Sequence, residues 1–137
     1  MRIVVVYGAL MSGKTSYVND SMKDIDLVFD YDALTQALTN SKYQHHNDSA
    51  HKPVMEIRNN MIEHAKQMKE GTLYIITTYL SYTLLDKVET HFNTQYKQMV
   101  TSLDECKRRL NASDRYNKHH LMQVYMNGMG SMCITKD

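Results

Sequence analysis

The sequence predicts an α/β protein with three layers, in which helices cover both faces of a four-stranded, mostly parallel sheet. Three observations favour this fold. A β-branched apolar run lies at residues 3–7, strand-like and helix-like segments alternate four times along the chain, and a glycine-rich motif separates the first strand from the first helix. Because parallel strands are joined by right-handed crossovers, the ligand site of such a sheet is expected at the carboxyl ends of its strands.

Hydrophobic periodicity gives the order of the elements. The strands are expected at residues 3–7, 25–29, 73–77 and 96–101. The helices are expected at residues 14–22, 33–38, 53–70, 83–91, 103–110 and 116–126. The first strand is followed by a helix and then by the second strand, which predicts a βαβ unit at the start of the chain.

Local signals set several boundaries. Asp32 can cap the short helix that follows it, and the polar residues 39–52 carry no apolar period, so they are predicted to form a loop. Pro53 suits the first turn of the next helix. Ser102 and Glu105 have the spacing of a capping box, so the helix after the fourth strand has the best-defined start.

Residues 8–15 fill every fixed position of G-x-x-x-x-G-K-[ST], the P-loop motif, between a strand and a helix. The glycines let the backbone curl, so that consecutive N–H groups converge on phosphate oxygens. Lys14 is expected to reach the β and γ phosphates, and the Thr15 hydroxyl is expected to bind Mg²⁺. The motif predicts a P-loop NTPase fold that binds ATP, with GTP as the alternative. The predicted nucleotide-binding residues are Gly8, Ala9, Leu10, Met11, Ser12, Gly13, Lys14, Thr15 and Ser16.

Length, charge and cysteine content restrict the class of protein. The 137 residues fit one nucleotide-binding domain over residues 1–137, with a helical lid region at about 103–127. A net charge of +1 argues against a broad cationic surface for nucleic acid. Cys106 and Cys133 are too few for a disulfide framework or a zinc site, and the apolar run at residues 3–6 is too short to span a membrane. A cytoplasmic location without membrane contact is therefore expected.

Acidic residues follow the second predicted strand instead of the third. The third strand ends in Thr77 and Thr78, where a Walker B acid is usual, whereas Asp30 and Asp32 follow the second strand directly. A carboxylate there can accept a proton from an attacking hydroxyl or hold Mg²⁺. Asp32 is predicted to be the base, with helix capping as its alternative role. Asp30 is the alternative base, and it is also a candidate metal ligand and substrate contact.

Arginines supply the remaining site candidates. Arg58 is expected on the apolar face of its helix, where its partner is an acid such as Asp30 or a substrate phosphate, unless the side chain extends to solvent. Arg109 and Arg115 are candidate lid residues over the transferred phosphoryl group. Because neighbouring helical residues are about 100° apart, only one of Arg108 and Arg109 is expected to face the nucleotide.

These motifs together resemble the P-loop kinase group. They are residues 8–15, the strand ending in Phe29-Asp30-Tyr31-Asp32, the missing Walker B acid and Glu105-Cys-Lys-Arg-Arg109. The resemblance covers roughly residues 1–126 and is strongest to the kinase domain of phage polynucleotide 5′-kinases. The chain also resembles small phage AAA-type P-loop ATP-binding proteins. It implies that Asp32 activates the acceptor hydroxyl and that Arg109 is a lid arginine. For a phage protein it also implies the host cytoplasm.

The chain departs from that family at two positions. Thr35 stands where the family has an arginine, and Thr77 stands where it has an acid. The resulting expectation is an ATP- and Mg²⁺-dependent phosphotransferase that acts on a nucleotide or a nucleic-acid 5′ end, with the oligomeric state left open. The alternatives are a nucleotide-dependent accessory ATPase or switch, and a nucleotide-binding module with reduced catalysis.

Overall fold

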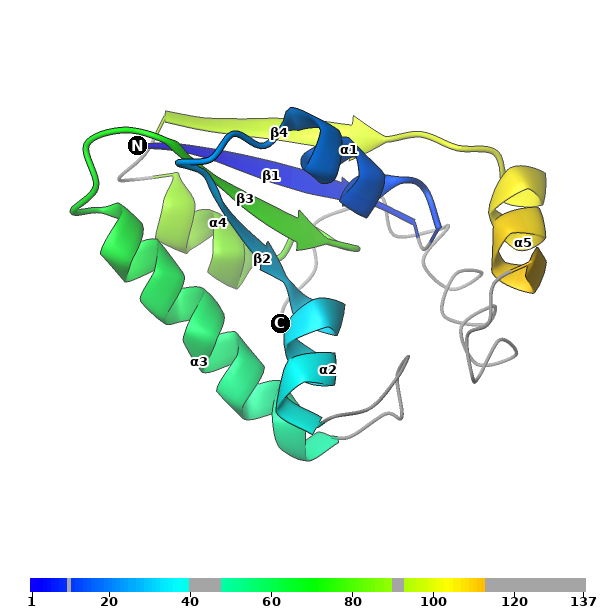
Figure 1. Ribbon diagram of the computed structural model, residues 1–137, viewed down its shortest axis with the longest axis horizontal. Helices are drawn as coiled ribbons and strands as arrows, with labels where there is room; N and C mark the ends of the chain where they lie inside the picture. Colours follow the sequence, from blue (N-terminus) through cyan, green and yellow to red (C-terminus); the bar gives the residue numbers. More distant parts are fainter. Residues whose placement is uncertain (10, 40–47, 90–92, 113–137) are drawn as a thin grey trace.

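The computed structural model describes residues 1–9, 11–39, 48–89 and 93–112. The strands are β1 (Arg2–Gly8), β2 (Leu27–Asp30), β3 (Thr72–Thr77) and β4 (Asn93–Met99). The helices are α1 (Lys14–Ser21), α2 (Tyr31–Thr39), α3 (Asp48–Ala65), α4 (Tyr82–Val88) and α5 (Leu103–Ala112). Strands and helices follow one another in the predicted order, so the α/β class is confirmed (Figure 1).

The four strands form one sheet in the order β2-β3-β1-β4. β1 pairs with β3 and with β4, and its Val5 lies opposite Ile75 and Tyr96. Every described pair is parallel, which requires a crossover between each pair of neighbouring strands. The carboxyl ends of the strands therefore meet at one edge, where the loop after β1 also lies (Figure 1).

Alternate residues of β1 and β3 pack on opposite faces of the sheet, as the period of a strand requires. The core on the face covered by α3 and α4 contains Ile3, Val5, Phe29, Val54, Ile62, Ala65, Leu73, Ile75, Leu84 and Val88. The core on the α1 face contains Val4, Val6, Val18, Tyr74 and Ile76. The predicted burial of β1 on both faces is confirmed, and Figure 1 shows α1 on the side of the sheet opposite α3 and α4.

The side chains of β4 are mostly exposed, unlike those of the other strands. The sequence places this strand at residues 96–101, but it covers residues 93–99. Within the described residues β4 pairs only with β1, so it is an edge strand, and its lysine and polar side chains suit that position. A polar strand has no apolar run for periodicity to detect, which explains the shifted boundary.

The second strand begins at Leu27, two residues later than predicted. Ile25 is 55% exposed, in a turn that precedes the strand. The carboxylate of Asp26 accepts hydrogen bonds from the backbone N–H of Lys23 at 2.9 Å and of Thr72 at 2.8 Å. This turn overrides the strand propensity of Ile25, because the side chain of Asp26 satisfies backbone donors that a strand would otherwise pair.

α3 begins at Asp48, so the prediction of a loop over residues 39–52 is wrong for its last five residues. Pro53 lies inside the helix and not in its first turn, and the helix ends at Ala65, not at residue 70. The first turns are polar, so they carry no apolar period that could reveal them. The predicted buried face is confirmed, since Val54, Arg58 and Ile62 are 0%, 6% and 1% exposed.

Part of the predicted lid region lies outside the described residues. The helix expected at residues 116–126 is in that part, and α5 is the portion of the region that the structure describes. In the described ranges, no helix combines the length and the apolarity that a membrane crossing needs. The extent of the domain and of the lid stays a prediction.

Candidate functional site

An open cleft with a volume of ≈ 950 Å³ lies at the carboxyl ends of the strands. We call one part of its wall the loop end, formed by residues 11–16, Met99, Thr101 and Arg109. We call another part the helix end, formed by Phe29, Asp30, Tyr31 and Asp32 around the start of α2 and by His51, Met55 and Arg58 of α3. The cleft occupies the position expected for the ligand site of an open parallel sheet.

The backbone of the loop end turns through residues in the left-handed region. Met11 has a φ of 63° and Gly13 a φ of 97°. Gly8 has a φ of 155°, and a Cβ at this residue would lie 2.7 Å from the carbonyl oxygen of Met99 and 2.9 Å from Oγ of Ser12. The motif therefore needs glycine at residue 8, because β4 and the loop approach its backbone too closely for a side chain.

The side chain of Lys14 folds into the loop. Its Nζ donates hydrogen bonds to the carbonyl oxygens of Gly8 at 2.5 Å and Ala9 at 3.0 Å. α1 begins at Lys14, and Gly13 before it provides no side-chain cap for the first N–H groups of the helix. An ammonium group and a helix N-terminus thus bring positive charge to the same place.

Ser12 contributes a buried hydroxyl to the loop end. The residue is 2% exposed, and its Oγ has no hydrogen-bond partner in the part of the chain that the structure describes. Leaving such a donor unsatisfied costs about 1–3 kcal/mol. A ligand oxygen in the loop would remove this cost, so the hydroxyl is a candidate phosphate contact.

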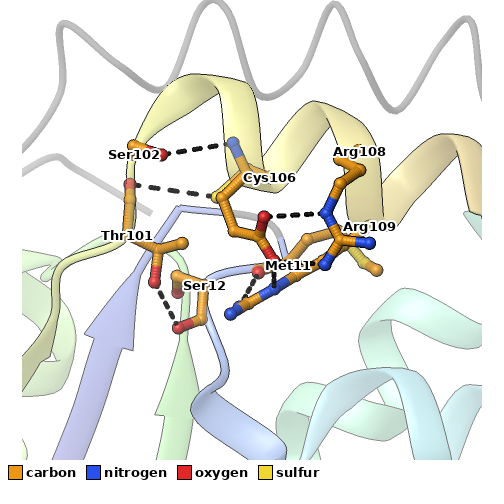
Figure 2. A network of polar contacts seen from close by, with 8 residues as sticks. Met11, Ser12, Thr101, Ser102, Cys106, Arg108 and Arg109 are labelled. Carbon is orange, nitrogen blue, oxygen red and sulfur yellow. Dashed lines mark hydrogen bonds and ion pairs between the residues drawn. The ribbon is translucent and has the colours of Figure 1, made fainter.

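Two hydrogen bonds that Figure 2 shows join the loop to the part of the chain that follows β4. Oγ1 of Thr101 donates to the carbonyl oxygen of Ser12 at 3.0 Å. Nη1 of Arg109 donates to the carbonyl oxygen of Met11 at 3.0 Å. These two bonds join the connection after β4 and the helix α5 to a loop that lies about ninety residues earlier in the chain.

Glu105 organises the arginines of α5. Its backbone N–H donates to Oγ of Ser102 at 3.2 Å, which confirms the predicted helix start. Its carboxylate pairs with Arg108 at 2.6 Å and with Arg109 at 3.0 Å. Hydrogen bonds from Arg108, and then from Arg109, lower the pKa of Glu105 to about 2. Arg109 contacts the loop, whereas the Arg108 side chain is 69% exposed (Figure 2).

The acids after β2 have different surroundings. Oδ1 of Asp30 accepts hydrogen bonds from the backbone N–H groups of Asp32 at 3.1 Å and Ala33 at 3.2 Å, so Asp30 caps α2. Asp32 lies inside the first turn of the helix, which begins at Tyr31. The prediction that Asp32 caps this helix is therefore wrong. Both carboxylates line the cleft.

The rest of the helix end comes from α2 and α3. Arg58 is buried on α3 and lines the cleft, and its Nη2 lies 3.5 Å from Oδ1 of Asn59. The hydroxyl of Tyr31 and Nδ1 of His51 are 2.8 Å apart and share a hydrogen bond. The ring centroids of these two residues are 5.7 Å apart, so the pair joins the start of α2 to the start of α3.

The two departures from the family pattern occupy different places. Thr35 is buried in α2, and its Oγ1 has no hydrogen-bond partner among the residues described. It is not among the residues that line the cleft. Thr77 lines the cleft at the end of β3, and its Oγ1 donates to the carbonyl oxygen of Tyr79 at 2.8 Å. The hydroxyl therefore has a structural role at the point where the family has an acid.

Two of the comparisons with known proteins give no match: no protein-family model matches the sequence, and no curated protein matches it. A solved structure does match, the unliganded crystal structure of a sugar kinase from Janibacter sp. HTCC2649. The TM-score is 0.58 and the identity 17%, over 99% of this chain and 85% of that chain. The chain has a P-loop kinase-like fold.

The P-loop kinase-like fold brings most predicted site residues into one cleft. Met11 to Ser16 of the loop, both acids, Arg58 and Arg109 all line it. Gly8 and Ala9 contact Lys14 through their carbonyl oxygens. Leu10 and Arg115 lie outside the described residues. The roles assigned to these residues stay predictions, because at 17% identity the match shows the fold alone.

Several residues of the cleft carry no sequence signal. Thr101, Met99 and Met55 belong to no motif and reach the cleft only through the fold. His51 likewise belongs to no motif, and its Nδ1 shares a hydrogen bond with the hydroxyl of Tyr31. Within the described ranges no three His, Cys, Asp or Glu side chains are grouped closely enough to hold a metal ion without other ligands.

Proposed function

We propose that the chain is an ATP- and Mg²⁺-dependent phosphotransferase that acts on a nucleotide or a nucleic-acid 5′ end, in the manner of polynucleotide kinases. The observation that carries this proposal is the composition of the loop end. The loop brings together the ammonium group of Lys14, the start of α1 and the hydroxyl of Ser12, which has no hydrogen-bond partner among the described residues. All three are donors, so a triphosphate oxygen would satisfy them together.

Oxygen-bearing side chains of the cleft suit Mg²⁺ as ligands. Thr15, Asp30 and Asp32 line the same cleft, and Mg²⁺ prefers hydroxyl, carboxylate and phosphate oxygens. Thr15 would hold the ion, with Asp30 as a further ligand. When bound, the ion neutralises charge on the phosphates.

In this proposal Asp32 accepts the proton of the attacking hydroxyl. Asp32 lies in the first turn of α2 and lines the cleft. Asp30 is less suited to that role, because one of its oxygens already accepts two backbone hydrogen bonds. The acceptor would thus lie between Asp32 and the triphosphate, and catalysis would depend on positioning and charge stabilisation.

Arg109 supplies positive charge beside the transferred group. Its Nη1 contacts the Met11 carbonyl, and it lies 3.9 Å from the point where a Cβ of Gly13 would be. An arginine this close to the loop can stabilise the charge that develops on the phosphoryl oxygens. Arg115 is the second lid candidate from the sequence.

The matching structure supports a second acceptor class. That protein is a sugar kinase, so a sugar hydroxyl is the alternative to a nucleotide or a nucleic-acid end. The same loop and the same base serve both acceptors, because the reaction at the γ-phosphoryl group is identical.

Label transfer tests the proposal. The protein is incubated with γ-labelled ATP and Mg²⁺ against 5′-hydroxyl oligonucleotides, mononucleotides, nucleosides and sugars. Label in one acceptor class, lost in Lys14→Ala, supports a phosphotransferase of that class. Label found only in free phosphate indicates an accessory ATPase. No nucleotide binding by calorimetry contradicts the proposal altogether.

A further inference from the structure

Arg58 is a buried charge at the wall of the cleft. It is 6% exposed and lies between Val54 and Ile62 on the core face of α3. Arginine is rarely this buried unless anionic or hydrogen-bonding groups surround it. Arg58 also lines the cleft, and the planar guanidinium group of an arginine suits a bidentate contact with an anion.

The cations of the cleft fall into two groups. Among the described residues that line it, the Lys and Arg side chains are Lys14, Arg58 and Arg109. Lys14 and Arg109 donate to the carbonyl oxygens of the loop, at the loop end. Arg58 comes from α3, at the helix end. A triphosphate held by the loop would therefore use the first two, and a second anion would meet Arg58.

The helix end is suited to one phosphate and not to a polyanion. Binding of a polynucleotide depends on several phosphate contacts. The described helix end offers a single arginine near two carboxylates, Asp30 and Asp32. The whole cleft, at ≈ 950 Å³, lies within the range of about 300–1,000 Å³ that is usual for small-molecule pockets. These properties favour a compact acceptor with one anionic group.

The apolar residues that line the cleft suit a ring. Phe29, Ile75 and Leu84 line the cleft and are 3%, 1% and 1% exposed, so they form an apolar floor. The hydrogen-bonded Tyr31 and His51 form its rim. An apolar floor beside polar rings accommodates a sugar or a base, whose faces are less polar than its edges.

We propose that the acceptor is a small molecule with one phosphate monoester and a separate hydroxyl, and that Arg58 binds this phosphate. The proposal rests on the phosphotransferase function proposed above and names its substrate class. Phosphate bound at Arg58 holds the molecule in the helix end, with its hydroxyl directed to Asp32. Mononucleotides and sugar phosphates share this chemistry.

The proposed reaction transfers the γ-phosphoryl group of ATP to the acceptor hydroxyl. The acceptor hydroxyl oxygen forms a bond to the γ-phosphorus of ATP, and the bond from that phosphorus to the β–γ bridging oxygen breaks. The bond electrons leave with ADP. The hydroxyl proton passes to the carboxylate of Asp32. The products are ADP and an acceptor with two phosphates.

Paired acceptors test the proposal. Adenosine 3′-monophosphate is compared with adenosine, and ribose 5-phosphate with ribose, using γ-labelled ATP. A bidentate charged contact should make kcat/KM about 10- to 100-fold higher for the phosphorylated member of a pair than for the member without the phosphate. The pair that shows this preference separates the nucleotide source from the sugar source. Arg58→Gln should abolish the preference, Arg58→Lys should keep part of it, and the exposed Arg108→Gln should leave it unchanged.

Thermal unfolding and calorimetry complete the test. Thermal unfolding identifies a variant that fails to fold, in which case Arg58→Lys alone is used. If no acceptor is labelled, the phosphotransferase function fails, and calorimetry on Lys14→Ala with the two phosphorylated probes tests Arg58 separately. The site is supported if a phosphorylated probe binds to Lys14→Ala but not to the double variant that also carries Arg58→Gln. Equal use of phosphorylated and plain acceptors, a preference for a 5′-hydroxyl oligonucleotide, or no binding of either probe overturns the proposal.

Discussion

The loop end and the helix end of the cleft differ in how their polar groups are held. At the loop end, Lys14 and Arg109 donate to backbone carbonyl oxygens of the loop itself. At the helix end, Asp30 caps α2, Tyr31 contacts His51, and Arg58 is buried on α3. The first end is suited to a phosphate chain of fixed shape. At the second end, the specificity for the acceptor would depend on the side chains of two helices, α2 and α3.

The largest expected effect comes from removing the proposed base at the helix end. Asp32→Asn removes the proposed base and keeps the shape of the helix end, so kcat should fall about 10²- to 10³-fold. The Kd for ATP should change less than about twofold, because the loop end is intact. Steady-state kinetics and calorimetry measure both quantities. A normal kcat in Asp32→Asn, together with a lost kcat in Asp30→Asn, would assign the base to Asp30.

Lys14→Ala should act on the loop end alone. Charged hydrogen bonds are worth about 1.5–3 kcal/mol, so the affinity for Mg²⁺ and ATP should fall about 10- to 100-fold. Lys66→Ala is the matched control, since Lys66 pairs with Glu63 at 2.7 Å on the surface and does not line the cleft. Calorimetry with ATP and then with GTP measures the loss. Equal affinities of the two variants would contradict a phosphate role for Lys14.

Arg109→Met tests whether α5 belongs to the loop end. The variant loses the bond to Met11, and kcat/KM for ATP should fall about tenfold. Arg108→Met removes the same kind of side chain from the solvent side of the helix and should change kcat/KM less than about twofold. The comparison is read from initial rates. Identical losses in both variants would mean that α5 acts only through its overall charge.

Asp30→Ala should lower stability at the helix end. Loss of the cap at the start of α2 should reduce the free energy of unfolding by about 1 kcal/mol. Asp32→Ala should have a smaller effect, because Asp32 does not cap the helix. Urea unfolding followed by circular dichroism measures the difference. Equal losses would show that the cap assigned to Asp30 is not what stabilises α2.

The smallest effect concerns pH at the loop end. Arg108 and then Arg109 lower the pKa of Glu105 from 4.5 to about 2, so the folded state favours the ionised carboxylate. The resulting stabilisation is present above pH 4.5 and is lost as the pH falls through about 2. A carbon-13 NMR titration should give a Glu105 midpoint well below 4.5, and Arg108→Gln should raise it. A midpoint at 4.5 in the wild type would contradict the ion pairs.

Prediction from the sequence succeeded where the signal was local. The P-loop motif occupies consecutive residues, so its place between β1 and α1 followed directly. The stripe of Val54, Arg58 and Ile62 followed from helical spacing, and the start of α5 followed from Ser102 and Glu105. Prediction failed where polar residues form regular structure, as in the first turns of α3 and in β4, because periodicity detects only apolar faces.

The sequence by itself determined the α/β class, the phosphate loop and the buried face that carries Arg58. Only the tertiary structure decided that β4 lies beside β1, that Arg109 contacts Met11, and that Tyr31 meets His51. The physical reason is the distance along the chain. A motif of neighbouring residues fixes its own backbone, whereas contacts between distant residues depend on how the whole sheet and its helices pack.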